Sequence, residues 1–373
     1  MLNFNVEKIN LSLQEYKRYS RNLILKEVGI QGQKRLKVAT VLCIGAGGLA
    51  TPLLMYLSAT GIGCIGIVDN DFVSLSNLQR QVLYNTSFIG TSKVQAAKLQ
   101  IQQINPNCIV HTYATKLNYN NAVLIISEYD IIVDATDNFI TRYLLSDVCS
   151  LLNKPLVYGA ILKNLGHVSV FNYRGGPNYR DLYPISPSPN SVPSCGEGGI
   201  FPGLAAIIGT LQSNEVIKII LGAGVVLSGE MLVYDFLTTK FSRLQINKAQ
   251  SLYRRYFLKK LNNSLDSFSY SNSTRDIMKQ LEISQIVLSE KNLLVDVRTS
   301  QEYNLYHIQD AVNIPLEELR MPKNIERLNQ EFNIGKKIIL YCQSNSRSLA
   351  ALVILLNMNL IPYRLRGGIG TVL

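Results

Sequence analysis

A run of apolar residues leading directly into a glycine-rich turn is the feature that most constrains this chain. Residues 38–44 are almost continuously apolar, which is typical of a strand buried in a parallel sheet. Gly45-Ala-Gly-Gly-Leu-Ala50 follows, a helical stretch begins near Pro52, and Asp69 ends the next apolar run. This order predicts a nucleotide site in which backbone amides hold a phosphate and the carboxylate holds a ribose.

The alternation of apolar runs and helical stretches continues along the chain and predicts two domains. The remaining strand-like runs are residues 64–68, 131–133, 156–158, 286–288, 293–295 and 337–341. A polar stretch rich in Ser and Asn, residues 262–274, separates the last three runs from the others and has the composition of a linker. We therefore predict an α/β fold with a doubly wound Rossmann-like domain over 1–250, a basic and polar linker over 251–275, and a second, smaller α/β domain over 276–373.

The composition limits the environment and the partners. The chain has 373 residues, of which 47% are hydrophobic and 17% charged. This composition is sufficient to form hydrophobic cores and excludes global disorder. It has no run of about 18 apolar residues and no secretory leader, so we expect no membrane span. Six scattered cysteines without a C-x-x-C pair predict reduced thiols in the cytoplasm, or in an organelle's stroma or matrix. A net charge of +11 favours anionic partners.

Cationic and carboxylate residues follow the strands of the first domain. Arg80 lies in Ser76-Asn-Leu-Gln-Arg-Gln81, Lys93 lies in the helical run Thr91 to Gln103, and Asp137-Asn138 comes after a later strand. Because the carboxyl ends of the strands converge on one crevice, we expect these side chains to lie together. A triphosphate needs cations and a carboxylate that holds Mg²⁺, whereas the diester of a dinucleotide needs little of this. The glycine turn alone fits an NAD-dependent dehydrogenase equally well.

A set of short motifs makes the first domain resemble the MoeB/ThiF family of ubiquitin-activating-enzyme-like adenylyltransferases. The resemblance covers nearly all of residues 12–247. The motifs are Arg18-Tyr-Ser-Arg21, Gly45-Ala-Gly-Gly48, Asp69-Asn-Asp71, Ser74-Leu-Ser-Asn-Leu-Gln-Arg-Gln81, Gly90-Thr-Ser-Lys93 and Asp134-Ala-Thr-Asp-Asn138. Members of this family use ATP to adenylate the C-terminal glycine of a small ubiquitin-like sulfur-carrier protein that ends in Gly-Gly.

The resemblance implies a role for each matching position. Gly48 and the neighbouring amides would hold phosphate, and Asp69 would hold the ribose. Asn77, Arg80 and Lys93 would bind the phosphates. The other implied nucleotide-binding positions are Gly45, Gly47, Ser76 and Asn138.

Two further roles concern the metal and the assembly. Asp137 would hold Mg²⁺ and, with Arg80, take part in catalysis. Arg21 would reach into the site of a second subunit, because family members are homodimers.

Cys195 lies in a long loop rich in Pro and Gly, in the string Val192-Pro-Ser-Cys-Gly-Glu-Gly-Gly199. Glycines beside a thiol let another backbone come close, and the resemblance implies that a cysteine here bonds covalently to the carrier. We therefore predict a catalytic role for Cys195. The remaining cysteines of this domain, Cys43, Cys64, Cys108 and Cys149, lie in apolar contexts and are expected to be packed.

The chain departs from many relatives at a structural zinc site. Those relatives carry two C-x-x-C pairs, whereas this chain has Pro177-Asn-Tyr-Arg-Asp181 at the first and no cysteine between Cys195 and Cys342. Asn178 and Asp181 cannot assemble a tetrahedral zinc site on their own. We predict no structural zinc and expect packing alone to hold the segment.

The C-terminal domain resembles a rhodanese-type sulfurtransferase over roughly residues 280–373. The motifs are Asp296-Val-Arg298, Glu302-Tyr303, His307-Ile308, Ala311-Val-Asn-Ile-Pro315, Tyr341-Cys-Gln-Ser-Asn-Ser-Arg-Ser348 and Arg366-Gly-Gly-Ile369. The resemblance implies that Cys342 carries a persulfide. A turn before a helix favours its thiolate, and Arg347 would add positive charge and brace the loop. We expect Asp296, Arg298 and His307 to be structural.

Together the two domains predict adenylation of a carrier followed by sulfur transfer that yields a thiocarboxylate. The expected cofactors are ATP and Mg²⁺, and the expected sulfur source is a persulfide donor such as a cysteine desulfurase. The motifs favour a carrier of the molybdopterin-synthase type, with thiamin synthesis or tRNA thiolation as alternatives. An NAD-dependent oxidoreductase and a non-catalytic scaffold remain open. The basic run 248–260 lacks a readout motif, so we expect no nucleic-acid partner.

Overall fold

The computed structural model describes residues 2, 4, 6–184, 199–248, 282–283, 292–343, 346–356, 358, 360–365 and 368–369. The chain divides into two compact units, Met1–Ser251 and Leu252–Leu373. The predicted linker, residues 251–275, and the predicted strand 286–288 lie outside the described residues.

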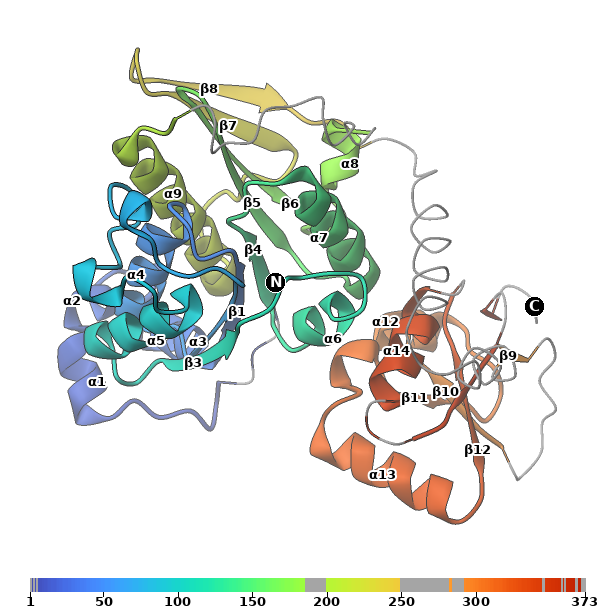
Figure 1. The fold of residues 1–373 in the computed structure, drawn as a ribbon. Helices are drawn as coiled ribbons and strands as arrows, with labels where there is room; N and C mark the ends of the chain where they lie inside the picture. Colours follow the sequence, from blue (N-terminus) through green and yellow to red (C-terminus); the bar gives the residue numbers. More distant parts are fainter. Residues whose placement is uncertain are drawn as a thin grey trace. The chain divides into compact units, whose positions relative to one another are not determined.

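An eight-stranded sheet forms the centre of the first unit, in the order β3-β2-β1-β4-β5-β6-β7-β8 (Figure 1). Neighbouring strands are parallel from β3 to β5 and antiparallel from β5 to β8. The strands are β1 Thr40–Ile44, β2 Cys64–Val68, β3 Ile109–Tyr113, β4 Ile131–Asp134, β5 Leu156–Leu162, β6 Leu165–Phe171, β7 Glu230–Asp235 and β8 Lys240–Gln245.

Helices cover both faces of the parallel part of this sheet, as the doubly wound prediction requires. Helices α4, α5 and α9 pack together on one side, and α6 and α7 lie on the other (Figure 1). The helices are α1 Leu13–Arg18, α2 Ser20–Leu23, α3 Gly29–Val38, α4 Ala50–Thr60, α5 Lys93–Ile104, α6 Ala122–Ser127, α7 Phe139–Leu152, α8 Tyr179–Leu182 and α9 Pro202–Leu221, with 3₁₀ turns at η1 Leu75–Asn77 and η2 Thr86–Phe88. The α/β fold is therefore confirmed.

The order of the strands creates a switch point between β1 and β4. From β1 the chain first proceeds outward through β2 and β3, and then returns to the other side of β1 through β4 and β5. In sheets of this kind a crevice opens outside the carboxyl ends of the strands where the order reverses. The glycine turn follows β1 and Asp137 follows β4, so both reach this crevice.

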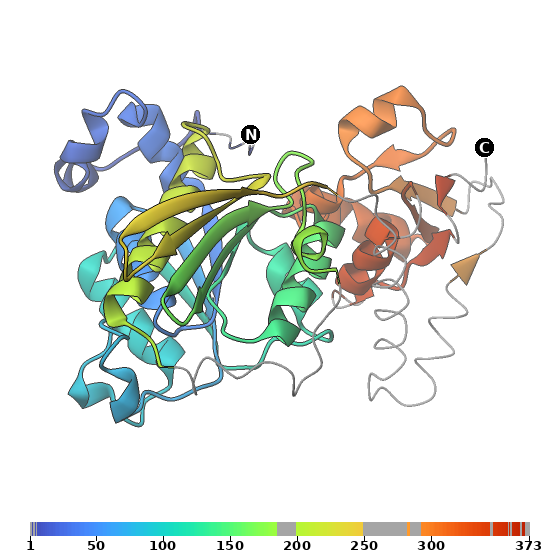
Figure 2. The ribbon, with the colours of Figure 1, turned by 90° about the horizontal axis from the view of Figure 1, so that it is seen from above.

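The antiparallel half of the sheet was not predicted. Figure 2 shows the β7–β8 hairpin extending the sheet beyond β6. All six residues of β8 are exposed, so this strand has no apolar run that would reveal it in the sequence.

Helix α9 is long and apolar enough, by length and composition, to cross a membrane. More than half of its apolar window, 56%, is buried inside the unit. Ile208, Val216 and Ile219 belong to the main core cluster, and Gln212 donates to the backbone carbonyl of Asp134. These contacts are those of a core helix of a globular domain.

The second unit contains a five-stranded parallel sheet in the order β11-β10-β12-β13-β9. Its elements are β9 Glu282–Ile283, β10 Asn292–Asp296, α12 Ser300–Leu305, β11 Val312–Asn313, η3 Leu316–Glu318, α13 Pro322–Asn333, β12 Lys337–Tyr341, α14 Ser346–Leu356 and β13 Tyr363–Leu365. Cys342 follows β12 directly and lies in the core beside Leu340 and Leu352. The small α/β domain is therefore confirmed.

Candidate functional site

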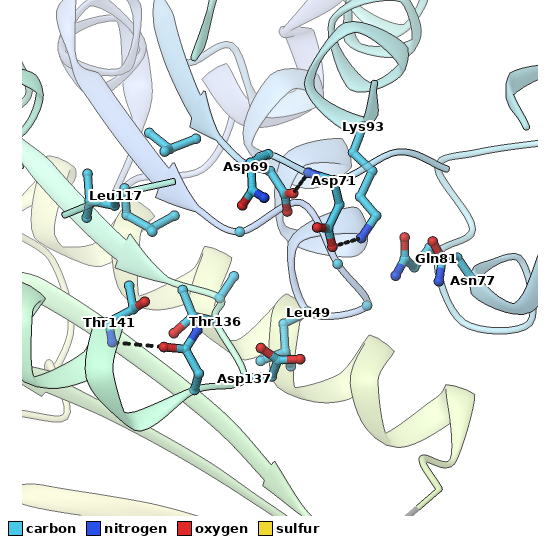
Figure 3. A pocket seen from close by; sticks show the side chains of 18 of the residues that line it. Leu49, Asp69, Asp71, Asn77, Gln81, Lys93, Leu117, Thr136, Asp137 and Thr141 are labelled. Atoms are coloured by element: carbon cyan, nitrogen blue, oxygen red, sulfur yellow. Dashed lines mark hydrogen bonds and ion pairs between the residues drawn. The ribbon is translucent and has the colours of Figure 1, made fainter. Parts of the chain in front are cut away.

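A cavity of about 360 Å³ opens at the switch point of the first unit. It is lined by the glycine turn after β1, the segment after β2, the start of α5 and the segment after β4 (Figure 3). The sequence-predicted positions that the structure brings together here are Gly45, Gly47, Gly48, Asp69, Asn77, Arg80, Lys93, Asp137 and Asn138.

The glycine turn is fixed by its own geometry and by Asp69. Gly45 has a φ of +93°, and a Cβ at this position would come within 2.7 Å of the Ala135 carbonyl oxygen, so only glycine fits. The Ala46 amide donates to Asp69 Oδ2 at 2.7 Å, and the Tyr84 hydroxyl donates to the Ala46 carbonyl at 2.9 Å. The turn is therefore rigid before any ligand enters.

The two predicted carboxylates differ in their partners. Both oxygens of Asp69 accept backbone N–H groups, Oδ2 from Ala46 and Oδ1 from Asp71, each at 2.7 Å. The Asp137 carboxylate is exposed, lines the cavity and has no hydrogen-bond or ion-pair partner within the described part of the chain. Carboxylate oxygens are the ligands that Mg²⁺ prefers, so Asp137 is suited to hold a divalent cation.

The two predicted cations of the cavity, Lys93 and Arg80, have different partners. Lys93 Nζ lies 2.9 Å from Asp71 Oδ2, and the Lys93 side chain is only 7% exposed. Arg80 donates to the Ser76 carbonyl at 3.2 Å. Figure 3 shows Asp71 and Lys93 facing one another near Asn77. Sequence reasoning did not assign Asp71 to the site, although it is part of the Asp69-Asn-Asp71 motif.

A second group of residues on the cavity wall was also missed. Thr136 and Arg142 line the cavity, and Arg142 donates to the Thr136 carbonyl at 2.9 Å. Asp134 accepts the Thr136 amide at 3.0 Å and its hydroxyl at 2.7 Å. Burial raises the pKa of Asp134, and the nearby charge of Arg142 opposes this rise. The motif Asp134-Ala-Thr-Asp-Asn138 contained the signal, but only its last two residues were assigned.

Two residues predicted for this site, Ser76 and Arg21, are not among those that line the cavity. Ser76 is exposed, and its hydroxyl oxygen lies 3.1 Å from that of Ser74. Arg21 is exposed on α2. Cys195 lies outside the described residues.

Residues 177–181, which match the first zinc-binding pair of many relatives, are linked to one another by local hydrogen bonds in this chain. The Asn178 amide donates to Asp181 Oδ2 at 2.7 Å, and Asn178 Oδ1 accepts the amides of Arg180 and Asp181 at 2.8 and 3.1 Å. The oxygens that could ligate a metal thus form a capping box at the start of α8. Among the described residues, no group of three His, Cys, Asp or Glu could hold a metal ion.

The expectation that packing alone holds this segment is wrong. Arg180 donates to both oxygens of Asp147 on α7, at 2.6 and 2.7 Å, and both side chains are at least nine-tenths buried. The Arg180 guanidinium also lies over the Tyr143 ring, 4.7 Å from its centroid. Tyr179 packs against four neighbouring aromatic rings, those of Tyr143, Tyr158, Phe171 and Tyr183. A bidentate ion pair therefore anchors α8 to α7.

The predicted persulfide cysteine of the second unit is buried. Cys342 is 1% exposed, and its Sγ accepts the Ser348 amide at 3.4 Å. The thiol donates to Ser348 Oγ at 3.5 Å.

Arg347 forms two hydrogen bonds with Glu302, at 2.5 and 2.7 Å, which join the first turn of α14 to α12. These hydrogen bonds lower the pKa of Glu302 to about 2. A carboxylate therefore balances the charge of Arg347, and sequence reasoning missed this partner.

Of the expected structural residues of the second unit, Asp296 and Arg298 are buried, whereas His307 is exposed. Asp296 and Arg298 are both fully buried and form an ion pair of 2.7 Å. Arg298 and the Tyr306 hydroxyl both donate to Gln343 Oε1, at 3.1 and 2.7 Å. His307 stacks on Tyr303 with ring centroids 3.9 Å apart. The residue that follows Cys342 is therefore held by its side chain.

The other described cysteines are packed rather than reactive. Burial raises the pKa of Cys43 and Cys149 well above the ordinary value, and raises that of Cys108 to about 12. Cys64 is half-buried, and burial raises its pKa as well. Neutral thiols are poor nucleophiles, so these four residues fit the predicted packing role.

Comparison with known proteins gives two family matches. The chain matches the ThiF family over residues 19–254 and the rhodanese-like domain over residues 279–371. It is 42% identical over 377 residues to the probable molybdopterin-synthase adenylyltransferase of Porphyra purpurea, with 100% of this chain and 96% of the relative covered. It is 36% identical over 356 residues to the adenylyltransferase and sulfurtransferase MOCS3 of Drosophila sechellia, covering 91% of this chain and 79% of the relative. It is 40% identical over 356 residues to the probable adenylyltransferase/sulfurtransferase MoeZ of Mycobacterium tuberculosis, covering 92% of this chain and 88% of the relative.

Solved structures show the same fold at lower identity. PaaA has a TM-score of 0.56 and 23% identity, covering 67% of this chain and 79% of that chain. E. coli MccB crystallised with ATP has a TM-score of 0.55 and 22% identity, covering 62% of this chain and 72% of the MccB chain. At this identity the likeness shows the fold alone.

Proposed function

The chain belongs to the ThiF family and carries a rhodanese-like domain, and from this premise we propose that it adenylates a small sulfur-carrier protein and then supplies the sulfur. The relatives are adenylyltransferases and sulfurtransferases, and this chain is an enzyme of that kind. We propose a carrier that ends in Gly-Gly and serves molybdopterin synthase, in keeping with the name of the algal relative.

The arrangement of charge in the cavity carries this proposal. Two cations, Arg80 and Lys93, line the same cavity as the glycine turn and the free Asp137 carboxylate. In adenylation, the carrier's terminal carboxylate attacks the α-phosphorus of ATP, an oxygen–phosphorus bond forms and pyrophosphate leaves. Both reactants are anions, so the cations must offset their repulsion and stabilise the departing pyrophosphate. An NAD-dependent oxidoreductase would have no use for this set.

Each residue in the cavity supports one part of this reaction. Asp69, held by two backbone amides, would orient the ribose hydroxyls, and the rigid glycine turn would place its amides against phosphate. We propose that Asp137 binds Mg²⁺, which would neutralise part of the phosphate charge. Lys93 and Arg80 would contact the phosphates. The outer sulfur of a Cys342 persulfide would attack the acyl-adenylate and expel AMP. A second thiol would then attack the sulfur of Cys342 in the resulting acyl disulfide, which releases the thiocarboxylate and leaves a disulfide.

The partners and assembly follow the same proposal. We propose a homodimer in which Arg21 reaches the partner's cavity, and a persulfide donor such as a cysteine desulfurase that loads Cys342. We also propose that Cys195 bonds to the carrier. The reduced cysteines suggest the cytoplasm, or an organelle's stroma or matrix.

Pyrophosphate release tests the proposed adenylation. The full chain is incubated with ATP, Mg²⁺ and a carrier that ends in Gly-Gly, and with the same carrier lacking its last residue. We expect pyrophosphate only with the intact carrier. Absence of pyrophosphate together with reduction of a nicotinamide cofactor would favour the oxidoreductase. Carrier binding without pyrophosphate release would favour a non-catalytic scaffold.

A further inference from the structure

The side chain of Gln343, the residue directly after Cys342, is held by two donors. Arg298 Nη1 donates to Gln343 Oε1 at 3.1 Å, and the Tyr306 hydroxyl donates to the same oxygen at 2.7 Å. A guanidinium has donors only, so the atom that faces Arg298 is the carboxamide oxygen and not the nitrogen. The two contacts therefore fix which way the carboxamide is turned.

Tyr306 is itself held by Arg298. Arg298 Nη2 donates to the Tyr306 carbonyl at 2.7 Å, and the guanidinium lies over the Tyr306 ring, 4.8 Å from its centroid. Arg298 is fully buried and paired with Asp296. Although Tyr306 is 41% exposed, a buried cation therefore holds both its backbone and its ring. Its hydroxyl is thus placed against Gln343.

The nitrogen of the Gln343 carboxamide is left to donate elsewhere. Gln343 is exposed, and no described residue accepts a hydrogen bond from its Nε2. Because the oxygen and the nitrogen of a carboxamide lie on opposite sides of its carbon, Nε2 is turned away from Arg298 and Tyr306. An uncharged donor of fixed orientation therefore stands on the exposed residue next to Cys342.

The proposed sulfur transfer creates an acceptor for such a donor. When the outer sulfur of a Cys342 persulfide attacks the acyl-adenylate, a carbon–sulfur bond forms and the carbonyl oxygen takes up an electron pair. That pair returns to the carbonyl bond as AMP leaves. A donor that is oriented before the reaction stabilises the charge on this oxygen. The nearby guanidinium groups of Arg347 and Arg298 are already paired with Glu302 and Asp296.

We propose that Gln343 donates from Nε2 to the carbonyl oxygen of the acyl group during sulfur transfer, and that Tyr306 holds Gln343 for this contact. Gln343 is then a catalytic residue, because it touches the reacting group, and Tyr306 is a positioning residue that acts through it. This inference rests on the proposed role of Cys342 as a persulfide carrier.

Two probes test the proposal in the full chain, without ATP or carrier. The Cys342 thiolate first attacks the outer sulfur of glutathione persulfide, a sulfur–sulfur bond forms and glutathione leaves. After excess reagent is removed, the new outer sulfur reacts either with p-nitrophenyl acetate, which releases p-nitrophenolate, or with iodoacetamide, which releases iodide. Only the ester places charge on a carbonyl oxygen during attack. Mass analysis of the peptide that contains Cys342 gives both rates, and their ratio cancels any change in the reactivity of the sulfur.

Two replacements of Gln343 separate the amide donor from structure and from charge. Gln343→Glu keeps an oxygen for Arg298 and Tyr306 to bind, and Gln343→Met has a similar length without charge, but neither has the N–H donor. We expect the ratio of acylation to alkylation to fall roughly 10²-fold in both variants. A purely structural role would spare the Glu variant, and repulsion by the new charge would spare the Met variant. The wild-type ratio in either one would overturn the proposal.

Removal of one hydroxyl tests the positioning role. Tyr306→Phe keeps the ring over Arg298, and we expect the ratio to fall about tenfold because Gln343 is less well oriented. Added to Gln343→Met, the same change should cause no further loss. Tyr303→Phe is the matched control, because that hydroxyl donates to the Ala311 carbonyl, at 2.6 Å, and its loss should leave the ratio unchanged. A wild-type ratio in Tyr306→Phe, or losses that multiply in the double variant, would overturn the positioning role.

The loading step keeps this result distinct from the proposed function. If the wild-type peptide gained no sulfur from glutathione persulfide, the persulfide role of Cys342 would fail, and this inference with it. If it gained one sulfur atom but the Gln343 variants kept the wild-type ratio, only the role of Gln343 would fail.

Discussion

The Lys93 ammonium lies 2.9 Å from the Asp71 carboxylate, inside the cavity at the switch point of the sheet. The Lys93 side chain is 7% exposed, while that of Asp71 is 60% exposed. A buried cation is therefore held in place by a carboxylate that reaches the solvent. This arrangement holds Lys93 in the cavity, where it would meet the phosphates of the proposed nucleotide.

Replacement of Lys93 tests this arrangement. We expect Lys93→Ala to lower ATP–pyrophosphate exchange by roughly 10²-fold, because a cation aimed at the transferring phosphate is lost. Lys98 lies on the same helix but does not line the cavity, so Lys98→Ala should exchange at nearly the wild-type rate. Equal losses in the two variants would show that general charge, rather than the position of Lys93, matters.

Asp137 provides a second prediction. Its carboxylate lines the cavity and has no partner among the described residues, so Asp137→Asn should leave the fold unchanged. We expect pyrophosphate exchange to fall by roughly 10²-fold and the half-saturating Mg²⁺ concentration to rise. A Mg²⁺ titration of both proteins measures this effect. An unchanged half-saturating concentration would remove Asp137 from the metal site.

The ion pair between Arg180 and Asp147 anchors α8 to α7, so we expect the folding stability of the chain not to depend on a bound metal. Because Asp147→Asn leaves a buried guanidinium without its counter-charge, we expect a loss of about 3 kcal/mol in the free energy of unfolding. Asp147→Leu combined with Arg180→Met should recover part of this loss. Urea unfolding of the full chain, followed by circular dichroism, measures all three proteins.

A metal chelator is the control for this ion pair. Because Asn178 and Asp181 use their oxygens in the capping box, a chelator should leave the unfolding midpoint of the wild type unchanged. A lower midpoint in the chelator would indicate a structural metal.

The parts of the fold that could be predicted are those with long apolar runs. Strands β2 and β12 have the predicted bounds, because each is a continuous buried run with a clear end. Strand β8 has no buried residue, so its place at the edge of the sheet depends only on its pairing with β7.

The partners of the charged residues could not be predicted, because they are set by the tertiary fold. Lys93 and Asp71 are 22 residues apart, and Arg347 and Glu302 are 45 residues apart. No periodicity in the sequence joins such pairs. The same reason explains why the ion pair of Arg180 with Asp147 was not predicted, since the two residues are 33 apart in the sequence.

The pair of Glu302 and Arg347 predicts a dependence on pH. The pKa of Glu302 in the folded chain is about 2, below its ordinary value of 4.5, so the pair stabilises the fold fully above pH 4.5 and is lost as the pH falls toward 2. We expect hydrogen exchange in residues 300–306 to be faster in Glu302→Gln than in the wild type at pH 6. The two proteins should become alike near pH 2. A difference that stays constant over this range would contradict the assignment.

The intact mass of the carrier tests the account most directly. A carrier that ends in Gly-Gly is incubated with ATP, Mg²⁺, a persulfide donor and either the wild-type chain or Cys342→Ala. We predict a thiocarboxylate with the wild type, and an adenylate without thiocarboxylate with Cys342→Ala. An unmodified carrier in both reactions, or a thiocarboxylate formed by Cys342→Ala, would contradict the account.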